Sequence, residues 1–171
     1  MKKLILLLAI GVLGVSSLMA QSPVDKIFED HYGEKGFTNV TITQYLFEMI
    51  AKMDTTESGR EMTEMAKSIE SIRVLAMDTI VGDVNLYDET MAAISKSDYK
   101  ELMRVKEENN DIVFMVNEKN GKVSELLMVV GGPKEENVLI SIKGDIDLAK
   151  MGSMAKTMNI KGMENLEKLG E

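Results

Sequence analysis

Cysteine and tryptophan are absent from the 171 residues of this chain, and histidine occurs once. Without cysteine the protein can form no disulfide, no thiolate metal site and no thiol nucleophile, and no lipid can be attached to an amino-terminal cysteine. The single histidine, His31, lies in the segment "EDHYGEK", which has neither a zinc-ligand spacing nor a nucleophile motif. We therefore expect His31 to be a surface residue without a catalytic role.

No apolar run in the chain is long enough to span a membrane comfortably. The longest one lies at the amino terminus. It covers residues 4–15, "LILLLAIGVLGV", follows Lys2 and Lys3, and precedes small residues around Ala20. These are the three parts of a secretory signal peptide. The alternative, a retained anchor helix, would need about 20 continuous apolar residues. We predict a signal peptide over 1–20 and a periplasmic or secreted mature protein with no stable membrane anchor.

Basic residues are outnumbered, with 20 Lys and Arg against 28 Asp and Glu. The predicted signal peptide holds two of the basic residues and none of the acidic ones, so 18 against 28 leave the mature chain at −10. Nucleic-acid binding depends on basic patches that neutralise phosphates, and attachment to anionic lipid depends on basic clusters. We expect no nucleic-acid partner; the acidity itself indicates solubility.

The rest of the chain is predicted to hold one domain. Residues 21–36 read as a linker or short helix, and residues 37–171 as a single α+β domain. Within it, 37–42 and 71–77 are β-rich, the second as an interior strand apolar on nearly both faces. Thr43 is a candidate helix cap, as are Asp83 and Asn85. The predicted apolar helix sides are Val24, Ile27 and Phe28; Tyr45, Leu46, Met49, Ile50 and Met53; Met62, Met65, Ala66 and Ile69; and Leu86, Tyr87, Met91 and Ile94.

Four strand-like runs follow in succession, at 99–107, 111–118, 122–132 and 137–145. Short turn signals separate them, and Asn120-Gly121 between alternating apolar runs is a strong hairpin signal. We predict a four-stranded antiparallel meander with one face on a core, extended by one or two further strands, with helices packed on one face. The residues predicted to share a face within each strand are Ile112, Phe114 and Val116; Val123, Leu127 and Val129; and Val138, Ile140 and Ile142.

The meander and the residues after it resemble a known family. The runs "ELMRVKE", "MVNEKNGKVSELLMVVGG", "LISIKGDIDLAKM" and "MNIKGMENL" are similar to an exported bacterial family catalogued as domain of unknown function 4252. The resemblance covers the chain from about Phe28 to Leu166. It implies an envelope protein, and it implies no activity, cofactor or site residues. Some members look like lipoproteins with a cysteine after the signal, a pattern from which this sequence departs.

Methionine is abundant, with 15 in the chain, and three of them lie in the segment "MGSMAKTM". Leu148, Met151, Ala155 and Met158 are spaced as one stripe of a helix, with Met154 beside it. Thioethers select Cu(I), so a soft-metal site is one interpretation, and a deformable partner surface is another. The shared apolar stripe favours a third interpretation, in which methionine fills space against the sheet.

Acidic residues offer two weaker candidates. Asp145 and Asp147 lie where the last predicted strand is followed by a helix. They could be calcium ligands. The better supported interpretation is that one caps the helix and the other is an acidic residue of its first turn. The pairs Glu107–Glu108 and Glu135–Glu136 lie in predicted turns, where carboxylates for glycoside hydrolysis are less expected than solvated charges. We predict no catalytic, cofactor-binding or metal-binding residues.

These observations predict an exported, non-catalytic binding or interaction protein of the cell envelope. Its partner would be an envelope protein or a small apolar ligand. The alternative is a periplasmic carrier or sensor that holds a small apolar ligand or Cu(I) through its methionine-rich helices. A hydrolase is the third possibility. An exposed apolar patch would favour the partner, an enclosed apolar cavity the ligand, and two facing carboxylates the hydrolase.

Overall fold

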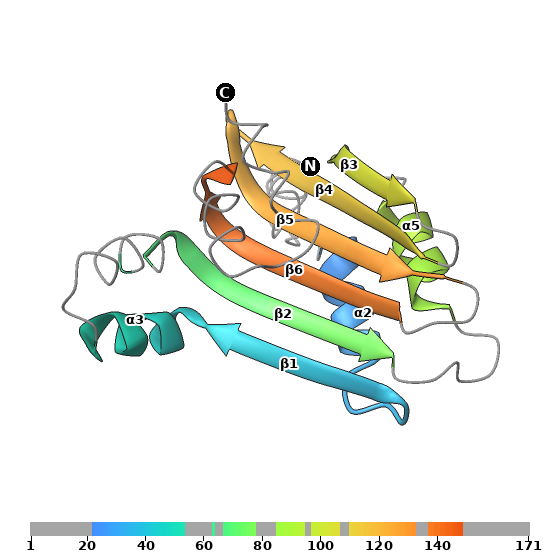
Figure 1. The fold of residues 1–171 in the computed structure, drawn as a ribbon, viewed down its shortest axis with the longest axis horizontal. Coiled ribbons are helices and arrows are strands. Elements are labelled where there is room, and N and C mark those ends of the chain that lie inside the picture. Colours follow the sequence, from blue (N-terminus) through green and yellow to red (C-terminus); the bar gives the residue numbers. More distant parts are fainter. Residues whose placement is uncertain are drawn as a thin grey trace, which may run out of the picture.

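A computed structural model describes residues 22–53, 63, 67–77, 85–94, 97–106, 110–132 and 137–148. This part of the chain forms an α+β fold with three helices and one six-stranded antiparallel sheet (Figure 1). The predicted signal peptide and the methionines from Met151 onward lie outside the described residues. The elements in chain order are α2 (Pro23–Asp30), β1 (Phe37–Thr43), α3 (Gln44–Met53), β2 (Ile69–Met77), α5 (Leu86–Ile94), β3 (Tyr99–Lys106), β4 (Asp111–Lys119), β5 (Lys122–Gly131) and β6 (Asn137–Ile146).

The sheet is built from the predicted meander plus two strands. Its order is β1-β2-β6-β5-β4-β3, and every neighbouring pair is antiparallel. The last four strands are neighbours in chain order, which confirms the meander, and β2 and β1 extend it beside β6. Asn120 and Gly121, with φ of 54° and 77°, join β4 to β5. Two consecutive positive φ values make the tight hairpin turn that the Asn-Gly pair predicts.

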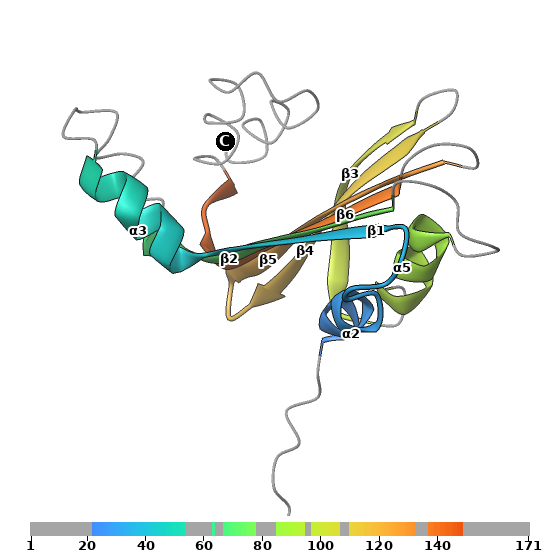
Figure 2. The same cartoon turned by 90° about the horizontal axis from the view of Figure 1, so that it is seen from below.

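Helices α2 and α5 lie on one face of the sheet and pack against each other (Figure 2). Beneath them, odd-numbered residues of the strands point toward the helices because successive strand side chains alternate between faces. Val24, Ile27 and Phe28 are buried on α2, as their helical spacing predicts. We call this the first core; its buried members are Val24, Ile27, Phe28, Leu75, Met77, Leu86, Ile94, Val113, Met115, Leu127, Val129 and Leu139.

Helix α3 does not join the other two helices. It begins at Gln44, directly after the last residue of β1, and it projects past the end of the sheet (Figure 2). The prediction that the helices pack on one face is therefore wrong for α3. The reason is geometric: no connecting residue separates strand from helix, so the chain has no length in which to turn back over the sheet.

The opposite face of the sheet carries a second core, built mainly from even-numbered strand residues. The prediction of a single buried face is therefore incomplete. The odd-numbered Ile69 belongs to this core because a register shift separates it from Ser71. Val123 packs against the second core, whereas Leu127 and Val129 face the helices, because a bulge between Val123 and Glu125 shifts the register against β6. The buried members of the second core are Ile69, Phe114, Val116, Leu126, Ile142 and Ile146.

The helix ends follow local capping chemistry. The Ser22 hydroxyl accepts a hydrogen bond from the Val24 N–H at 3.3 Å, and Pro23 occupies the first turn of α2. Asn85 accepts from the Asp88 N–H at 3.1 Å, so it is the cap of α5 that the sequence offers. The fully buried Asn137 accepts from the Tyr87 N–H at 3.3 Å and ties α5 to the start of β6.

Strand β2 begins earlier than predicted. Ile69 is the first residue of β2 and not the last of a helical stripe, since its side chain is buried in the second core. The other predicted members of that stripe, Met62, Met65 and Ala66, lie outside the described residues. As predicted, β2 occupies an interior position, between β1 and β6. Among the described residues, no helix is long and apolar enough to cross a membrane.

Candidate functional site

The exposed large hydrophobic side chains of the described residues all come from one stretch of chain, 32–53. This stretch contains the loop before β1, β1 itself and α3, and β1 and α3 follow one edge of the sheet and its extension (Figure 1). A few isolated exposed hydrophobics are normal, whereas several from one stretch make that stretch a candidate interaction site. We call the group the edge surface; its members are Tyr32, Val40, Tyr45, Leu46, Met49, Ile50 and Met53.

Helix α3 supplies most of the edge surface. Its sequence, "QYLFEMIAKM", has only Gln44, Glu48 and Lys52 as polar residues, and these lie on one narrow side because they are four residues apart. At about 100° per residue, the exposed apolar side chains of α3 cover an arc of roughly 140°. Phe47 lies outside this arc and packs against the second core. The helix is therefore held to the sheet by Phe47 while its apolar stripe faces outward.

The stripe of α3 has the pattern of a helix that docks into a groove. Leu46, Met49, Ile50 and Met53 occupy positions i, i+3, i+4 and i+7. Leu46, Met49 and Ile50 are each more than 40% exposed, and Met53 is 82% exposed. The sequence predicts this stripe correctly as one face of a helix, but the structure leaves that face uncovered.

Strand β1 is an edge strand without the features that usually block strand addition. Its sequence, "FTNVTIT", contains no charge and no proline. All seven residues pair with β2 in continuous register, from Phe37 opposite Met77 to Thr43 opposite Ser71. Long, flat and uncharged edges are ready to pair with another chain.

The other edge of the sheet, β3, is protected. It carries Lys100, Glu101, Arg104 and Lys106. A register shift between Glu101 and Met103 also breaks the regularity of its pairing with β4. Charges and bulges of this kind prevent edge-to-edge association. The contrast between the two edges makes β1 the side of the sheet that is open to a partner.

His31 is buried and paired, which corrects the prediction of a surface residue. Its side chain is 9% exposed, with Nδ1 2.5 Å from Glu34 Oε2 and Nε2 2.8 Å from Glu89 Oε2. Its ring stacks on Phe37 with centroids 4.2 Å apart. Burial alone lowers the pKa of His31, but the hydrogen bonds and charges of the two carboxylates outweigh it and raise that pKa. His31 thus links the end of α2 to β1 and α5, and the two carboxylates favour its protonated form.

A cluster of charged residues lies between α2 and the sheet. Asp25 of α2 accepts hydrogen bonds from Arg73 and from Lys143, whose Nζ lies 2.6 Å from Oδ1. Burial alone would raise the pKa of Asp25, but the two cations lower it. The Arg73 guanidinium also lies over the Phe28 ring, 4.2 Å from its centroid. These contacts hold α2 against β2 and β6.

A group of buried polar side chains lies at the centre of the sheet, next to the charged cluster around Asp25. Glu125, only 5% exposed, accepts hydrogen bonds from the Tyr99 and Ser141 hydroxyls, each at 2.6 Å. Burial, followed by the hydrogen bond to Glu125, raises the pKa of Tyr99 well above its ordinary value. Ser141 has no exposed surface and already donates to Glu125, so its hydroxyl cannot meet a substrate in this arrangement. No sequence pattern predicts this group, because its members come from three separate strands.

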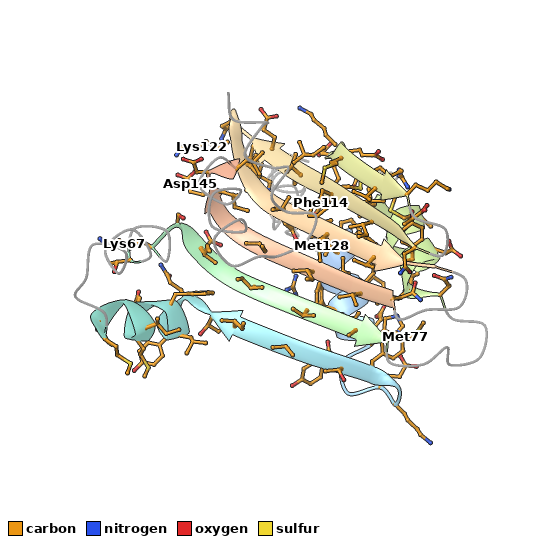
Figure 3. The ribbon with its side chains drawn as sticks, viewed as in Figure 1. Lys67, Met77, Phe114, Lys122, Met128 and Asp145 are labelled. Atoms are coloured by element: carbon orange, nitrogen blue, oxygen red, sulfur yellow. The ribbon has the colours of Figure 1, made fainter. Side chains whose placement is uncertain are left out.

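The acidic candidates from the sequence do not come together. Asp145 lies within β6, not before a helix, so it is not the predicted cap; it pairs instead with Lys122 at 2.5 Å across the hairpin (Figure 3). Asp147 directly precedes Leu148, which is helical and packs against the second core. Glu107–Glu108 and Glu135–Glu136 lie outside the described residues. Within the described ranges, no three His, Asp or Glu side chains are placed to hold a metal ion.

The described methionines divide between core and surface. Met77 and Met115 are buried in the first core, and Met128 packs against the second (Figure 3). These positions match the interpretation of methionine as space-filling. Met49 and Met53 depart from it, because both are exposed on α3.

The fold and its edge thus define an α+β domain with buried polar links and one exposed apolar edge. A family model described as "Domain of unknown function (DUF4252)" matches residues 29–154. The chain belongs to this family, as the resemblance of its meander indicates. No curated protein and no solved structure matches the chain.

Proposed function

We propose that this protein is an exported, non-catalytic interaction protein of the cell envelope, and that it binds another protein through the edge surface. The observation that carries the proposal is the gathering of every exposed large hydrophobic of the described residues on 32–53. An apolar helix stripe beside an uncharged strand edge provides both side-chain anchors and backbone hydrogen-bonding capacity. The export of the protein rests on the signal-peptide pattern of residues 1–20.

The chemistry of α3 favours a protein over a lipid surface. Interfacial membrane helices usually carry several Lys or Arg on their polar side. The polar side of α3 has Gln44, Glu48 and Lys52, which sum to no net charge. The mature chain carries a net charge of −10, so anionic headgroups would repel it at long range. The expected partner presents an apolar groove with a polar rim.

The same chemistry weighs against a carrier of Cu(I) on α3. Met49 and Met53 stand one turn apart and offer two thioethers. Their neighbours on the exposed arc are Tyr45, Leu46 and Ile50. These side chains are hydrocarbon or phenol and add no thioether or imidazole ligand for Cu(I). A stripe of this composition is suited to a dry contact with a protein.

The test is photocrosslinking in intact cells. A benzophenone amino acid replaces Met49 in the full chain, and a matched variant carries it at Lys100, an exposed position on the protected edge β3. We expect a reproducible protein adduct at position 49, identified by mass spectrometry, and none at position 100. The absence of an adduct at 49, or the same adducts at both positions, would overturn the proposal.

Two accompanying measurements check the other parts of the proposal. The amino-terminal sequence of the protein from the envelope fraction should begin at Gln21; an intact Met1 in the cytosolic fraction would contradict export. Flotation of the purified protein with phosphatidylcholine vesicles should fail. Flotation that a Met49→Gln, Ile50→Gln double variant abolishes would show that α3 binds lipid and not protein.

A further inference from the structure

The proposed interaction surface has properties that point to one particular occupant. We infer that the edge surface binds a second copy of this chain, through antiparallel pairing of β1 with β1 about a two-fold axis at Val40. This inference rests on the proposed function and names the partner. It would join the two sheets edge to edge into one continuous sheet.

Strand β1 is self-complementary in this arrangement. A two-fold axis at Val40, the middle of the seven residues of β1, places each residue opposite a residue of the other copy and leaves none unpaired. Any other register shortens the overlap. Val40 meets its own equivalent on the axis, and its side chain is 43% exposed, so the contact would cover apolar surface.

The two ends of the edge surface also match each other. Antiparallel pairing places the end of one β1 beside the start of the other. The end leads directly into α3 with its apolar stripe, and the start follows the loop that carries Tyr32, which is 79% exposed. A two-fold axis therefore places α3 of each copy beside the start of β1 of the other copy. This reciprocity is what an isologous interface requires.

Charge explains why this edge, and not the other, suits two copies of an acidic chain. Copies with a net charge of −10 repel each other wherever their charges face one another. The strand β1 has no charged residue, and the charged residues of α3, Glu48 and Lys52, lie outside its apolar arc. No other described element lies along the outer side of β1 (Figure 1).

The length of the surface suits a stable dimer. The seven residues of β1 extend about 24 Å and the ten of α3 about 15 Å. A standard interface buries ~800 Å² per partner, so α3 would have to add its exposed stripe to the contact that β1 makes.

A charge swap at the axis tests the inference with the full purified protein in sedimentation velocity. The wild type should sediment with twice the mass of the chain, and Val40→Thr, which adds no charge, should behave likewise. Val40→Lys and Val40→Glu each place two like charges on the axis, so each should weaken dimerisation about fivefold. An equimolar mixture of the two variants should dimerise again. A monomeric wild type, or a dimer that both charged variants leave intact, would overturn the inference.

A disulfide provides a second readout that does not depend on the stability of charged variants. Because the chain has no cysteine, Val40→Cys can form a disulfide only between copies. Residues opposite each other in an antiparallel pair have the Cα separation that a disulfide needs. Under mild oxidation Val40→Cys should yield a covalent dimer, whereas the matched variant Lys100→Cys on β3 should form no covalent dimer. Equal dimer from both variants would contradict pairing at β1.

The two proposals fail in different ways. A monomeric purified protein together with a Met49 adduct to a different envelope protein would refute the second copy and leave the proposed function standing. A dimer with an adduct of the chain to itself would support both. A monomer with no adduct at position 49 would refute both.

Discussion

The buried pair of ionic contacts around His31 leads to a prediction about stability and pH. The perturbation is His31→Gln, which removes the positive charge but keeps one side-chain N–H donor. In the wild type both ring nitrogens face carboxylates, Glu34 and Glu89, and the second of these lies 58 residues away in the sequence. The substitution therefore tests a link among α2, β1 and α5 that only a cationic ring can make on both sides.

The magnitude follows from the exposure of the groups. A hydrogen bond to a charged group contributes about 1.5–3 kcal/mol to the free energy of unfolding, and an exposed hydrogen bond contributes less. The side chains of Glu34 and Glu89 are 45% and 38% exposed, so both carboxylates regain water when the ring is replaced. One donor also remains in the glutamine. We expect His31→Gln to lower the free energy of unfolding by about 2 kcal/mol at pH 5.5.

The sign of the pH dependence follows from the raised pKa of His31. A group whose pKa is higher in the folded state stabilises that state fully below its unfolded pKa, about 6.5 for histidine. The contribution is then lost as pH rises through the folded-state pKa. Chemical denaturation of both proteins at intervals from pH 5.5 to 9.5 should therefore show a difference that shrinks with rising pH.

A matched control lies on the same helix. Lys26→Gln removes the exposed pair of Lys26 with Asp30, and the hydrogen bond to Asp30 raises the pKa of Lys26 above its ordinary value, away from this pH range. Its effect on stability should not change between pH 5.5 and 9. If the difference between wild type and His31→Gln were the same across the range, His31 would not be cationic in the folded protein, and the reasoning would be refuted.

Two further predictions concern the packing of the domain and use thermal or chemical denaturation. The Thr90 hydroxyl is fully buried and has no hydrogen-bond partner within the described part of the chain, so Thr90→Val should raise the free energy of unfolding by about 1 kcal/mol. A loss of stability would show that the hydroxyl has a partner after all. Gly144 has φ of +149°, and a Cβ there would meet the Ser68 carbonyl oxygen at 2.0 Å, so Gly144→Ala should cost about 3 kcal/mol. Gly121→Ala, with positive φ but open space around it, should cost only about 1 kcal/mol, and equal costs would contradict the backbone clash.

Three predictions based on neighbouring residues agree with the structure. The Asn120-Gly121 turn, the apolar stripe of α2 and the Asn85 cap of α5 each depend on a few consecutive residues. Backbone conformation and capping are local, so the sequence carries the whole signal. The family resemblance extends the same information over the meander.

The parts that the sequence did not reveal depend on segments far apart in the chain. Alternation alone could not place Val123 on the face opposite Leu127, because a bulge depends on the pairing with β6. The burial of His31 depends on Glu89, and the polar group around Glu125 depends on three strands coming together. The weak signal for the open edge, an uncharged β1 beside a nearly all-apolar α3, was present in the sequence but has meaning only once β1 is known to be an edge.

The sequence by itself determined the Asn120-Gly121 turn, the apolar sides of α2, α3 and α5, the four-stranded meander and the acidic character of this protein. Periodicity, capping and charge are properties of adjacent residues. Only the tertiary structure decided which apolar stripe is covered. The stripes of α2 and α3 look alike in sequence, yet one lies against the sheet and the other faces outward. Burial depends on what lies opposite a surface, and the strand order β1-β2-β6-β5-β4-β3 sets that for this domain.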